Sequence, residues 1–293
     1  MSERSWLFVP GDSERKLLKI ENCGADVVIL DLEDSVAAEQ KAAARSRVGH
    51  FLAAHSGRRA MQLWVRINPL DTAASAADLT AIAAGRPDGI VQPKTRSPAD
   101  VVRLGQYLDD FERQHGLAPG GIRVMPIATE TPEALFAMGG FGQCGARLAG
   151  LTWGAEDLSA AIGASANQEA DGAWTAPFQL ARSLCLFGAA AAGVAAIDTL
   201  HIDYRDHAGL RSSCAAARRD GFTGKLAIHP DQVALINECF LPSGAEVAHA
   251  RRVLALFAAN PGAAALSLDG RMVDIPHRRQ AEKTLARAVG VKS

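Results

Sequence analysis

Residues 26–34 read DVVILDLED, an uninterrupted apolar run that leads into three closely spaced carboxylates. Four consecutive aliphatic side chains are typical of a strand buried on both faces, and parallel sheets bury both faces of their strands. Because such strands alternate with helices, the run predicts an α/β protein. It also predicts that Asp31, Glu33 and Asp34 lie at the carboxyl end of a strand, where α/β folds of this kind bind their ligands.

Similar short apolar segments recur along the chain, separated by longer segments of helical character. The candidate strands are eight: Trp6–Val9, Asp26–Asp31, Gln62–Ile67, Gly89–Gln92, Arg123–Ala128, Leu148–Trp153, Thr199–Asp203 and Lys225–Ile228. Helices are expected at Ser13–Cys23, Gln40–Ala54, Pro98–His115, Pro132–Met138, Pro177–Gly193 and Pro230–Phe240. Eight βα units predict a (β/α)₈ TIM barrel. A doubly wound sheet, which usually has about five or six strands, is the structural alternative.

The length of 293 residues fits one large domain with an appendage. We expect a barrel domain over residues 1–242 and a C-terminal helical and lid extension over residues 243–293. Within the extension, Gly244–Asn260 and Arg278–Val289 have helical patterns, and Pro261–Gly270 has the composition of a loop.

Charge and composition exclude several classes of protein. The chain has 31 Lys and Arg residues against 32 Asp and Glu residues, which argues against broad binding of nucleic acid or an anionic membrane. No apolar run approaches the ~18 residues that span a bilayer, and the first residues do not have the pattern of a signal peptide. The five scattered cysteines form no C-x-x-C pair, so we expect reduced thiols and a cytoplasmic protein.

Polar side chains follow most of the predicted strands. In chain order they are Asp31-Leu32-Glu33-Asp34, Arg66-Ile67-Asn68, Gln92-Pro93-Lys94, Thr129-Glu130-Thr131, Gly154-Ala155-Glu156-Asp157, Asp203 and His229-Pro230. Carboxylates from at least three strands therefore meet on one rim, and a hard divalent cation would relieve their repulsion. Glu130 and Asp157 lie one βα unit apart, close enough to share an ion, and all-oxygen ligands favour Mg²⁺ or Mn²⁺ over zinc.

Each of these residues also has a structural interpretation. Asp34 and Asp157 could cap the helices that follow them, Arg66 could pair with a carboxylate of residues 31–33, and Lys94 could pair with a neighbouring carboxylate. Placement at five strand ends together favours a functional site over five unrelated structural roles.

The turn Pro10–Lys16 is a separate signal. It places Arg15 and Lys16 beside the start of a predicted helix at the mouth of the barrel. A helix N-terminus with cations nearby suits a phosphate group, although basic residues on a surface helix are more often simply solvated.

These strand-end residues carry a family resemblance. The matching stretches are Arg4–Gly11 (RSWLFVPG), Val28–Asp34 (VILDLED), Arg66-Ile67-Asn68, Pro93-Lys94, Glu130-Thr131-Pro132, Gly154–Leu158 (GAEDL) and Ala227–Pro230 (AIHP). In their order and spacing they resemble the citrate lyase beta subunit and its acyl-CoA lyase relatives in the HpcH/HpaI aldolase superfamily, from about residue 4 to residue 285.

The resemblance implies a TIM barrel with Mg²⁺ bound by Glu130 and Asp157, and an arginine, Arg66, that grips a substrate carboxylate. It implies thioester substrates, carried by coenzyme A or by an acyl carrier protein. The segment Ser267–Pro276 resembles the lid of malyl-CoA lyase-like members, in which the residue matching Asp274 reaches a neighbouring subunit's site as general acid/base. The structural alternative is a capping Asp before Pro276.

We therefore expect a Mg²⁺-dependent carbon–carbon lyase that cleaves or forms a 3-hydroxyacyl thioester such as citryl-CoA or malyl-CoA. The products are acetyl-CoA and a 2-oxo acid, oxaloacetate or glyoxylate. Asp31, Glu33 and Asp34 would orient Arg66, Lys94 or metal-bound waters, and Arg15 and Lys16 would contact CoA phosphates.

Three alternatives stay open at this point. Lys94 could form a Schiff base in a metal-free aldolase. Thioester hydrolysis could follow condensation on the same site. The chain could also be a subunit of a multi-component citrate lyase, catalytic or not, that works with an acyl carrier protein. A homo-oligomer, a trimer or a hexamer, fits the shared lid.

Overall fold

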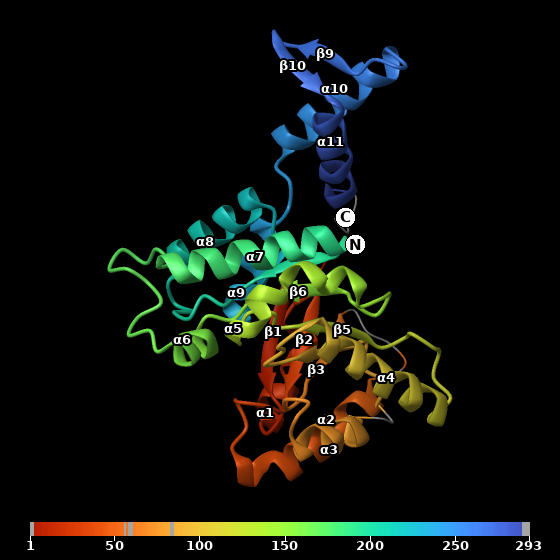
Figure 1. Ribbon diagram of the computed structural model, residues 1–293, viewed down its shortest axis with the longest axis vertical. Helices are drawn as coiled ribbons and strands as arrows, with labels where there is room; N and C mark the ends of the chain where they lie inside the picture. The colour runs from red at the N-terminus through yellow and green to blue at the C-terminus, as the bar shows by residue number, and fades with distance from the viewer. Residues whose placement is uncertain (1–2, 56, 58–60, 83–84, 289–293) are drawn as a thin grey trace. The chain divides into compact units, whose positions relative to one another are not determined.

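The computed structural model describes residues 3–55, 57, 61–82 and 85–288. The chain divides into two compact units, of which the first is Glu3–Asn237 and the second begins at Glu238. The first unit contains all the candidate site residues except Asp274. Figure 1 labels the helices and strands along the chain.

The first unit is built on eight parallel strands that pair in the order β5-β4-β3-β2-β1-β8-β7-β6. Parallel bridges from Val124 to Leu148 and from Ile127 to Thr152 join β5 to β6, the first and last strands in this order. The sheet therefore closes on itself, which confirms the predicted (β/α)₈ barrel and rules out the doubly wound alternative, since that sheet stays open. The strands are β1 (Ser5–Pro10), β2 (Val27–Asp31), β3 (Gln62–Arg66), β4 (Gly89–Gln92), β5 (Arg123–Pro126), β6 (Gly150–Thr152), β7 (Ala195–Asp198) and β8 (Gly224–Ala227).

Helices surround these strands (Figure 1). They are α1 (Glu14–Leu17), α2 (Lys41–Ala54), α3 (Ala73–Ile82), α4 (Pro98–Gln114), α5 (Pro132–Ala137), α6 (Glu156–Ile162), α7 (Ala176–Ala192), α8 (His207–Asp220) and α9 (Pro230–Cys239). Local sequence sets several of their ends. Ser97 precedes Pro98 in a capping box with Asp100, and Gly193 ends α7 in the left-handed conformation at φ 69°. No helix in the described part of the chain is both long enough and apolar enough to cross a membrane.

The interior of the barrel is a packed apolar core. Trp6 on β1 and Trp64 on β3 meet edge to face with their ring centroids 5.0 Å apart, and both are buried. Gly89 on β4 lies against this pair, and a Cβ atom there would come within 2.5 Å of the Trp64 ring. The absence of a side chain at this position therefore lets the large indole fill the barrel.

The predicted seventh strand, Thr199–Asp203, is wrong. The strand is β7 (Ala195–Asp198), and residues 199–203 form the loop after it. The segment that forms the strand has two small Ala side chains and a single β-branched residue, so its strand pattern is weak. The correction moves the carboxyl end of the strand from Asp203 to Asp198.

The predicted helix Ser13–Cys23 is also wrong in its length. Only Glu14–Leu17 is α-helical, and a separate 3₁₀ turn covers Ile20–Asn22. A single helical turn has almost no dipole to stabilise a phosphate, so a helix N-terminus no longer supports phosphate binding near Arg15 and Lys16. Two helices that follow strands, α3 and α8, lay outside the predicted set.

The second unit contains α10 (Gly244–Ala259), β9 (Ala265–Leu268), β10 (Arg271–Asp274) and α11 (Ile275–Ala288). The prediction of a loop over Pro261–Gly270 is wrong in part, because β9 pairs antiparallel with β10. Asp269 and Gly270, both at positive φ, form the turn of this hairpin. We propose that the domain boundary lies at residue 242, because a division at Glu238 falls inside α9.

Candidate active site

Arg66 ends β3 and is held by two carboxylates that follow β2. Its Nε and Nη2 donate to Asp31 Oδ1 and Oδ2 at 2.7 and 2.6 Å, and its Nη1 lies 2.9 Å from Glu33 Oε2. The guanidinium also lies over the Phe8 ring, 4.8 Å from its centroid. The strand register explains the first pair, since Asp31 and Arg66 are direct partners between β2 and β3. The structural interpretation of Arg66 as a partner of these carboxylates is therefore confirmed.

Burial and charge pairing compete in setting the pKa values of Asp31, Glu33 and Arg66. Burial disfavours the charged forms, but the Arg66 charge outweighs it and holds the pKa of Asp31 below its usual value. For Glu33 burial prevails, and its pKa is raised. Arg66 itself has a raised pKa, because the two carboxylates oppose the effect of burial.

Lys94, which follows β4, connects the loops after three other strands. Its ammonium lies 2.5 Å from Glu33, 2.9 Å from Asp34 and 3.3 Å from Asp157. Its backbone N–H donates to Glu130 Oε2 at 2.6 Å. Lys94 adopts φ 48°, an uncommon conformation for a residue with a side chain, and such backbone strain clusters at functional sites.

The environment of Lys94 disfavours a Schiff base. Burial would lower its pKa, but the hydrogen bonds that its ammonium donates to Glu33 and Asp34, together with the charges of Glu33 and Glu130, raise it above the usual value. An imine-forming lysine needs a neutral amine and hence a lowered pKa. The ammonium is instead held charged between carboxylates.

Glu130, which follows β5, is the least compensated carboxylate at the barrel mouth. Burial raises its pKa to about 8, and the charges of Asp157 and Glu33 add to that effect against the Lys94 N–H and Arg66. Its Oε1 faces Gly154, where a Cβ atom would come within 3.3 Å. Gly154 therefore keeps open the space on the side of Glu130 that Lys94 does not occupy.

These residues fit a magnesium ion. Among residues 3–288, apart from the undescribed positions, no three His, Cys, Asp or Glu side chains group as a metal site. Mg²⁺, however, needs only one or two protein carboxylates and otherwise keeps water or substrate oxygens. Glu130 and Asp157 provide two hard oxygen donors, and a cation between them would offset the repulsion that raises the pKa of Glu130. The other carboxylates, Asp31 and Glu33, are already paired with cations.

Asp157 does not cap its helix. It lies in the first turn of α6, whose N-cap is Ala155 and has no side-chain cap. It forms an ion pair with Lys94 and is one-third exposed, so it is open to a ligand from the pocket. The capping interpretation of Asp157 is therefore wrong, which leaves the metal-binding prediction in place.

The structure does not bring all the predicted site residues together. Arg15 and Lys16 are exposed on α1 and do not line the pocket described below. Asp274 ends β10 in the second unit, where its Oδ1 lies 2.5 Å from His277 Nδ1 and accepts a capping bond from the His277 backbone at 3.4 Å. The hydrogen bond from His277 lowers the pKa of Asp274. The capping interpretation is thus confirmed, while a role at another subunit's site stays a prediction.

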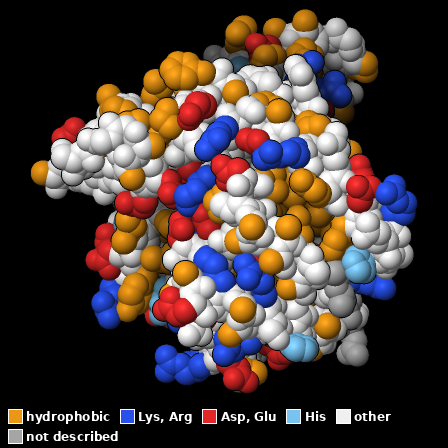
Figure 2. Space-filling model, turned by 60° about the horizontal axis from the view of Figure 1, so that its bottom comes forward, with side chains coloured by type: hydrophobic (Ala, Val, Ile, Leu, Met, Phe, Trp, Pro, Cys, Tyr) orange, Lys and Arg blue, Asp and Glu red, His pale blue; other side chains and the backbone are white. Residues whose placement is uncertain are grey.

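A pocket of about 1000 Å³ opens at the carboxyl ends of the strands, with Arg66, Glu130 and Asp157 among its lining residues. The strand arrows of β1 and β2 point to the bottom of Figure 1, and Figure 2 turns this side forward. Acidic and basic side chains lie side by side on that face (Figure 2). The pocket is therefore a polar cleft at the end of the barrel where such folds carry out their chemistry.

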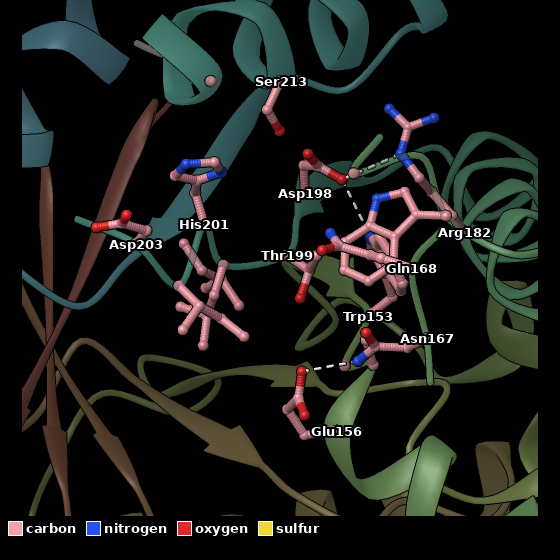
Figure 3. Close-up of a pocket in the computed structure, with 18 of the residues that line it drawn as sticks. Trp153, Glu156, Asn167, Gln168, Arg182, Asp198, Thr199, His201, Asp203 and Ser213 are labelled. Atoms are coloured by element: carbon pink, nitrogen blue, oxygen red, sulfur yellow. Dashed lines mark hydrogen bonds and ion pairs between the residues drawn. The ribbon is translucent and has the colours of Figure 1, made fainter. Parts of the chain in front are cut away.

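A second ionic cluster, which the sequence did not reveal, lines the same pocket. Asp198 at the end of β7 accepts from Trp153 Nε1 at 2.8 Å, with Arg182 Nε at 3.3 Å (Figure 3). It also accepts from Lys225 Nζ at 2.7 Å. Burial would raise the pKa of Asp198, but the charges of Lys225 and Arg182 hold it below its usual value. The misplaced seventh strand hid Asp198; an acid directly after the apolar Ala195–Ile197 was the available signal.

Comparison with known proteins identifies the family. The model of the HpcH/HpaI aldolase/citrate lyase family matches residues 4–230. A second model, described as a C–C bond lyase of the TIM-barrel fold, matches residues 185–290. Together these matches extend over both units of the chain.

Relatives of known name cover almost the whole chain. A citrate lyase subunit beta-like protein of Mycobacterium tuberculosis is 36% identical over 97% of this chain and 94% of its own length. A (3S)-malyl-CoA thioesterase of Cereibacter sphaeroides is 32% identical over 98% and 95%. The structure of the M. tuberculosis protein CitE in complex with magnesium, acetoacetate and coenzyme A is 34% identical, with a TM-score of 0.81 over 98% of both chains. The chain therefore belongs to the HpcH/HpaI aldolase/citrate lyase family and is a carbon–carbon bond lyase with a TIM-barrel fold.

Proposed function

We propose that this protein is a Mg²⁺-dependent lyase that cleaves, or forms, a 3-hydroxyacyl-CoA thioester, with acetyl-CoA and a 2-oxo acid as the other side of the reaction. The observation that carries the proposal is Glu130, a carboxylate whose burial, with the charges of Asp157 and Glu33, raises its pKa to about 8, and which lies in one pocket with Asp157 and Arg66. The relative whose structure contains magnesium, an oxo acid and coenzyme A supports it.

In this proposal Glu130 and Asp157 hold the magnesium ion. The bound ion would supply Lewis-acid stabilisation for the oxygen that gains charge when the carbon–carbon bond breaks or forms. Glu130 would have to be ionised to hold the ion, and burial, which raises its pKa, opposes that ionisation.

Arg66 would bind a carboxylate of the substrate. A guanidinium has five N–H donors, and two of them are hydrogen-bonded to Asp31, while Glu33 is an ion-pair partner of Nη1. The N–H groups that are not hydrogen-bonded suit a substrate carboxylate, and the Phe8 ring under the guanidinium fixes its plane.

Asp31, Glu33 and Asp34 would act indirectly, by positioning the Arg66 and Lys94 side chains. Asp31 fixes the direction of Arg66, and Glu33 connects Arg66 with Lys94. Asp34 holds the Lys94 ammonium from the exposed side. Such supporting contacts typically affect activity by keeping the residues that touch substrate in place.

Two further roles concern parts of the chain outside the pocket. Asp274 would move the proton at the thioester α-carbon from a neighbouring subunit of a homo-oligomer, a trimer or a hexamer. Arg15 and Lys16 would bind CoA phosphates. Changing both to Ala should raise KM for the CoA thioester several-fold at unchanged kcat; an unchanged KM would exclude this role.

The proposal is tested by assaying the purified protein with malyl-CoA and citryl-CoA, and for condensation with acetyl-CoA. Cleavage should stop in EDTA and return with Mg²⁺ or Mn²⁺. Absence of any carbon–carbon cleavage or formation in folded, Mg²⁺-loaded protein would contradict it. Activity that survives EDTA, with borohydride trapping of a keto acid on Lys94, would instead establish the imine mechanism.

Thioester hydrolysis is a second candidate, since one relative is a (3S)-malyl-CoA thioesterase. The same assay distinguishes it, because hydrolysis releases free CoA and a hydroxy acid without a 2-oxo acid. An acyl-carrier-protein substrate within a multi-component citrate lyase is the third candidate. Turnover of free CoA thioesters at rates typical of an enzyme would argue against it.

A further inference from the structure

Thr129, the residue immediately before Glu130, has a polar side chain that is fully buried. Its Oγ1 donates to the Gly154 carbonyl oxygen at 3.1 Å and accepts from the Gly154 backbone N–H at 3.1 Å. A single hydroxyl can do both, since it has one donor and two acceptor lone pairs. It therefore satisfies both backbone polar groups of one residue in the segment that follows β6.

The Thr129 hydroxyl extends the pairing of the two strands beyond the point where their backbone bonds end. Ile127 forms a parallel bridge with Thr152, and the Ala128 N–H donates to Thr152 O at 2.8 Å. Within the described residues, this is the last backbone hydrogen bond between the two segments before the rim of the barrel. A parallel ladder would continue through backbone groups. Here a side chain takes their place and holds the two segments together one step nearer the site.

These hydrogen bonds lie between the two carboxylates that are predicted to bind metal. Glu130 directly follows Thr129, and Asp157 lies in the first turn of α6, three residues after Gly154. The two segments are also closely packed, because a Cβ atom at Gly154 would come within 3.1 Å of Glu130 Cγ. The separation of the two backbone segments therefore limits the separation of the two carboxylates.

Lys94 contacts the same two carboxylates in a different way. Its backbone N–H donates to Glu130 at 2.6 Å, and its ammonium lies 3.3 Å from Asp157. A long, flexible side chain can follow Asp157 when that residue moves, and water screens a contact with a carboxylate that is one-third exposed. The two Thr129 bonds are part-buried and act on the backbone directly, so they complement the Lys94 contact.

From these contacts we propose that Thr129 is a positioning residue for the metal site. Its hydroxyl fixes the separation of the segments that carry Glu130 and Asp157, and it thereby increases the affinity for Mg²⁺. The inference rests on the metal ligands of the proposed function. Mg²⁺ demands near-octahedral geometry with ligands at about 2.0–2.1 Å, so a small change in the separation of two ligands weakens binding. Loss of a contact that supports a metal ligand typically costs about 10–100-fold in affinity.

Thr129→Val tests the inference, because valine keeps the shape of the side chain and removes the hydroxyl. Calorimetric titration of the metal-free, full-length protein with Mg²⁺ should show an affinity about tenfold or more below that of the unmodified protein. Thr129→Ser keeps the hydroxyl and should restore most of the affinity. The Mg²⁺ concentration for half-maximal activity should rise in Thr129→Val by the same factor, while KM for the thioester at saturating Mg²⁺ stays unchanged.

Thr152 provides the matched control. It is equally buried and lies on the adjoining strand, but its hydroxyl has no hydrogen-bond partner in the part of the chain that the structure describes. Thr152→Val should therefore leave the Mg²⁺ affinity unchanged. An equal loss of affinity in Thr152→Val would contradict the inference, because the effect would then not depend on the bonds to Gly154.

A purely structural role for Thr129 gives a different result. It would lower the Tm of Thr129→Val and leave the Mg²⁺ affinity of the folded protein unchanged, which overturns the inference. If Thr129→Val does not fold, Thr129→Ala carries the same expectation, because the smaller side chain leaves room for water to bond to the Gly154 backbone groups.

The outcomes also separate this inference from the proposed function. An Mg²⁺ affinity of Thr129→Val equal to that of the unmodified protein overturns the inference and leaves the lyase function standing. The expected order of affinities, in a protein that neither breaks nor forms a carbon–carbon bond, supports the inference and overturns the lyase function. An unmodified protein that binds no Mg²⁺ overturns both.

Discussion

The barrel has two ionic clusters at the carboxyl ends of its strands, and they differ in how completely their charges are paired. Around Asp198, one buried carboxylate meets Lys225, Arg182 and an indole N–H, and its pKa is lowered. Around Glu130, the carboxylate meets one backbone N–H and a second carboxylate, and its pKa is raised to about 8. The two residues are similarly buried, so burial alone does not set them apart.

The difference shows which carboxylate is part of the scaffold and which awaits a ligand. A buried charge that the protein itself neutralises stabilises only the folded chain, whereas an uncompensated one costs stability and persists where function requires it. Asp198 and Glu130 should therefore respond in opposite ways to neutralisation, to pH and to metal.

Glu130→Gln should have the largest effect on activity. Loss of a metal ligand is expected to reduce kcat/KM by about 10³-fold or more. The same change should not lower the Tm of the metal-free protein at neutral pH, since Glu130 is already protonated there and the amide is neutral as well. Activity within tenfold of the unmodified enzyme, measured in EDTA-treated and Mg²⁺-loaded samples, would remove Glu130 from the metal site.

Asp198→Asn should act chiefly on stability. It leaves the Lys225 ammonium buried without a counter-charge, which typically costs about 3–5 kcal/mol of unfolding free energy. Adding Lys225→Met should restore a large part of this loss, because the unpaired charge is then removed. Urea denaturation measures both. A loss below about 1 kcal/mol for Asp198→Asn alone would show that the cluster is not structural in this sense.

Asp274→Ala tests whether the carboxylate that pairs with His277 is also catalytic. Its pair with His277 is exposed and should contribute little to stability. If Asp274 moves the α-carbon proton, kcat should fall by about 10²-fold with a nearly unchanged KM for the thioester. His277→Gln is the control for loss of the pair alone. Normal turnover in Asp274→Ala would leave this residue with only its capping role.

The pH dependence of stability should have opposite signs at the two clusters. Without metal, unfolding lets Glu130 ionise near its ordinary pKa of about 4.3, while the folded state keeps its proton to about 8. The contribution of Glu130 to unfolding free energy therefore falls as pH rises between these values. Asp198, with a lowered pKa, contributes stability above the unfolded pKa, and that contribution is lost as pH falls through its folded value.

Magnesium binding tests the difference between Glu130 and Asp198 most directly, although the expected effect is the smallest of these. Because the ion displaces a proton from Glu130, Mg²⁺ affinity should rise by up to about tenfold per pH unit between pH 6 and 8 and then level off. Calorimetric titration at several pH values measures it, with Asp198→Asn as a control that keeps the slope. An affinity that does not change over this range would contradict a protonated Glu130 in the free protein.

The sequence was most informative about the strands that are strongly apolar. The run after Asp26 and the residues at its end predicted β2 and the position of Asp31 correctly, because a doubly buried strand has few alternatives. The seventh strand was misplaced because Ala195–Asp198 has two small side chains and only one β-branched residue, so its strand pattern is weak. Packing against neighbouring strands decided that segment, and a local pattern does not contain that information.

The candidate site shows the same limit. Spacing was enough to bring Arg66, Glu130 and Asp157 to one pocket. It could not indicate that Lys94 would adopt a positive φ or that Asp198 would pair with Lys225. Those features depend on contacts between residues far apart in the chain, and they decide which charges are neutralised.

The contacts of Lys94 have one further consequence. A single residue ties together the segments after β2, β4, β5 and β6, through its ammonium on one side and its amide on the other. Half of the barrel rim is thereby preorganised before any ligand arrives, so little reorganisation free energy should remain for substrate binding to supply.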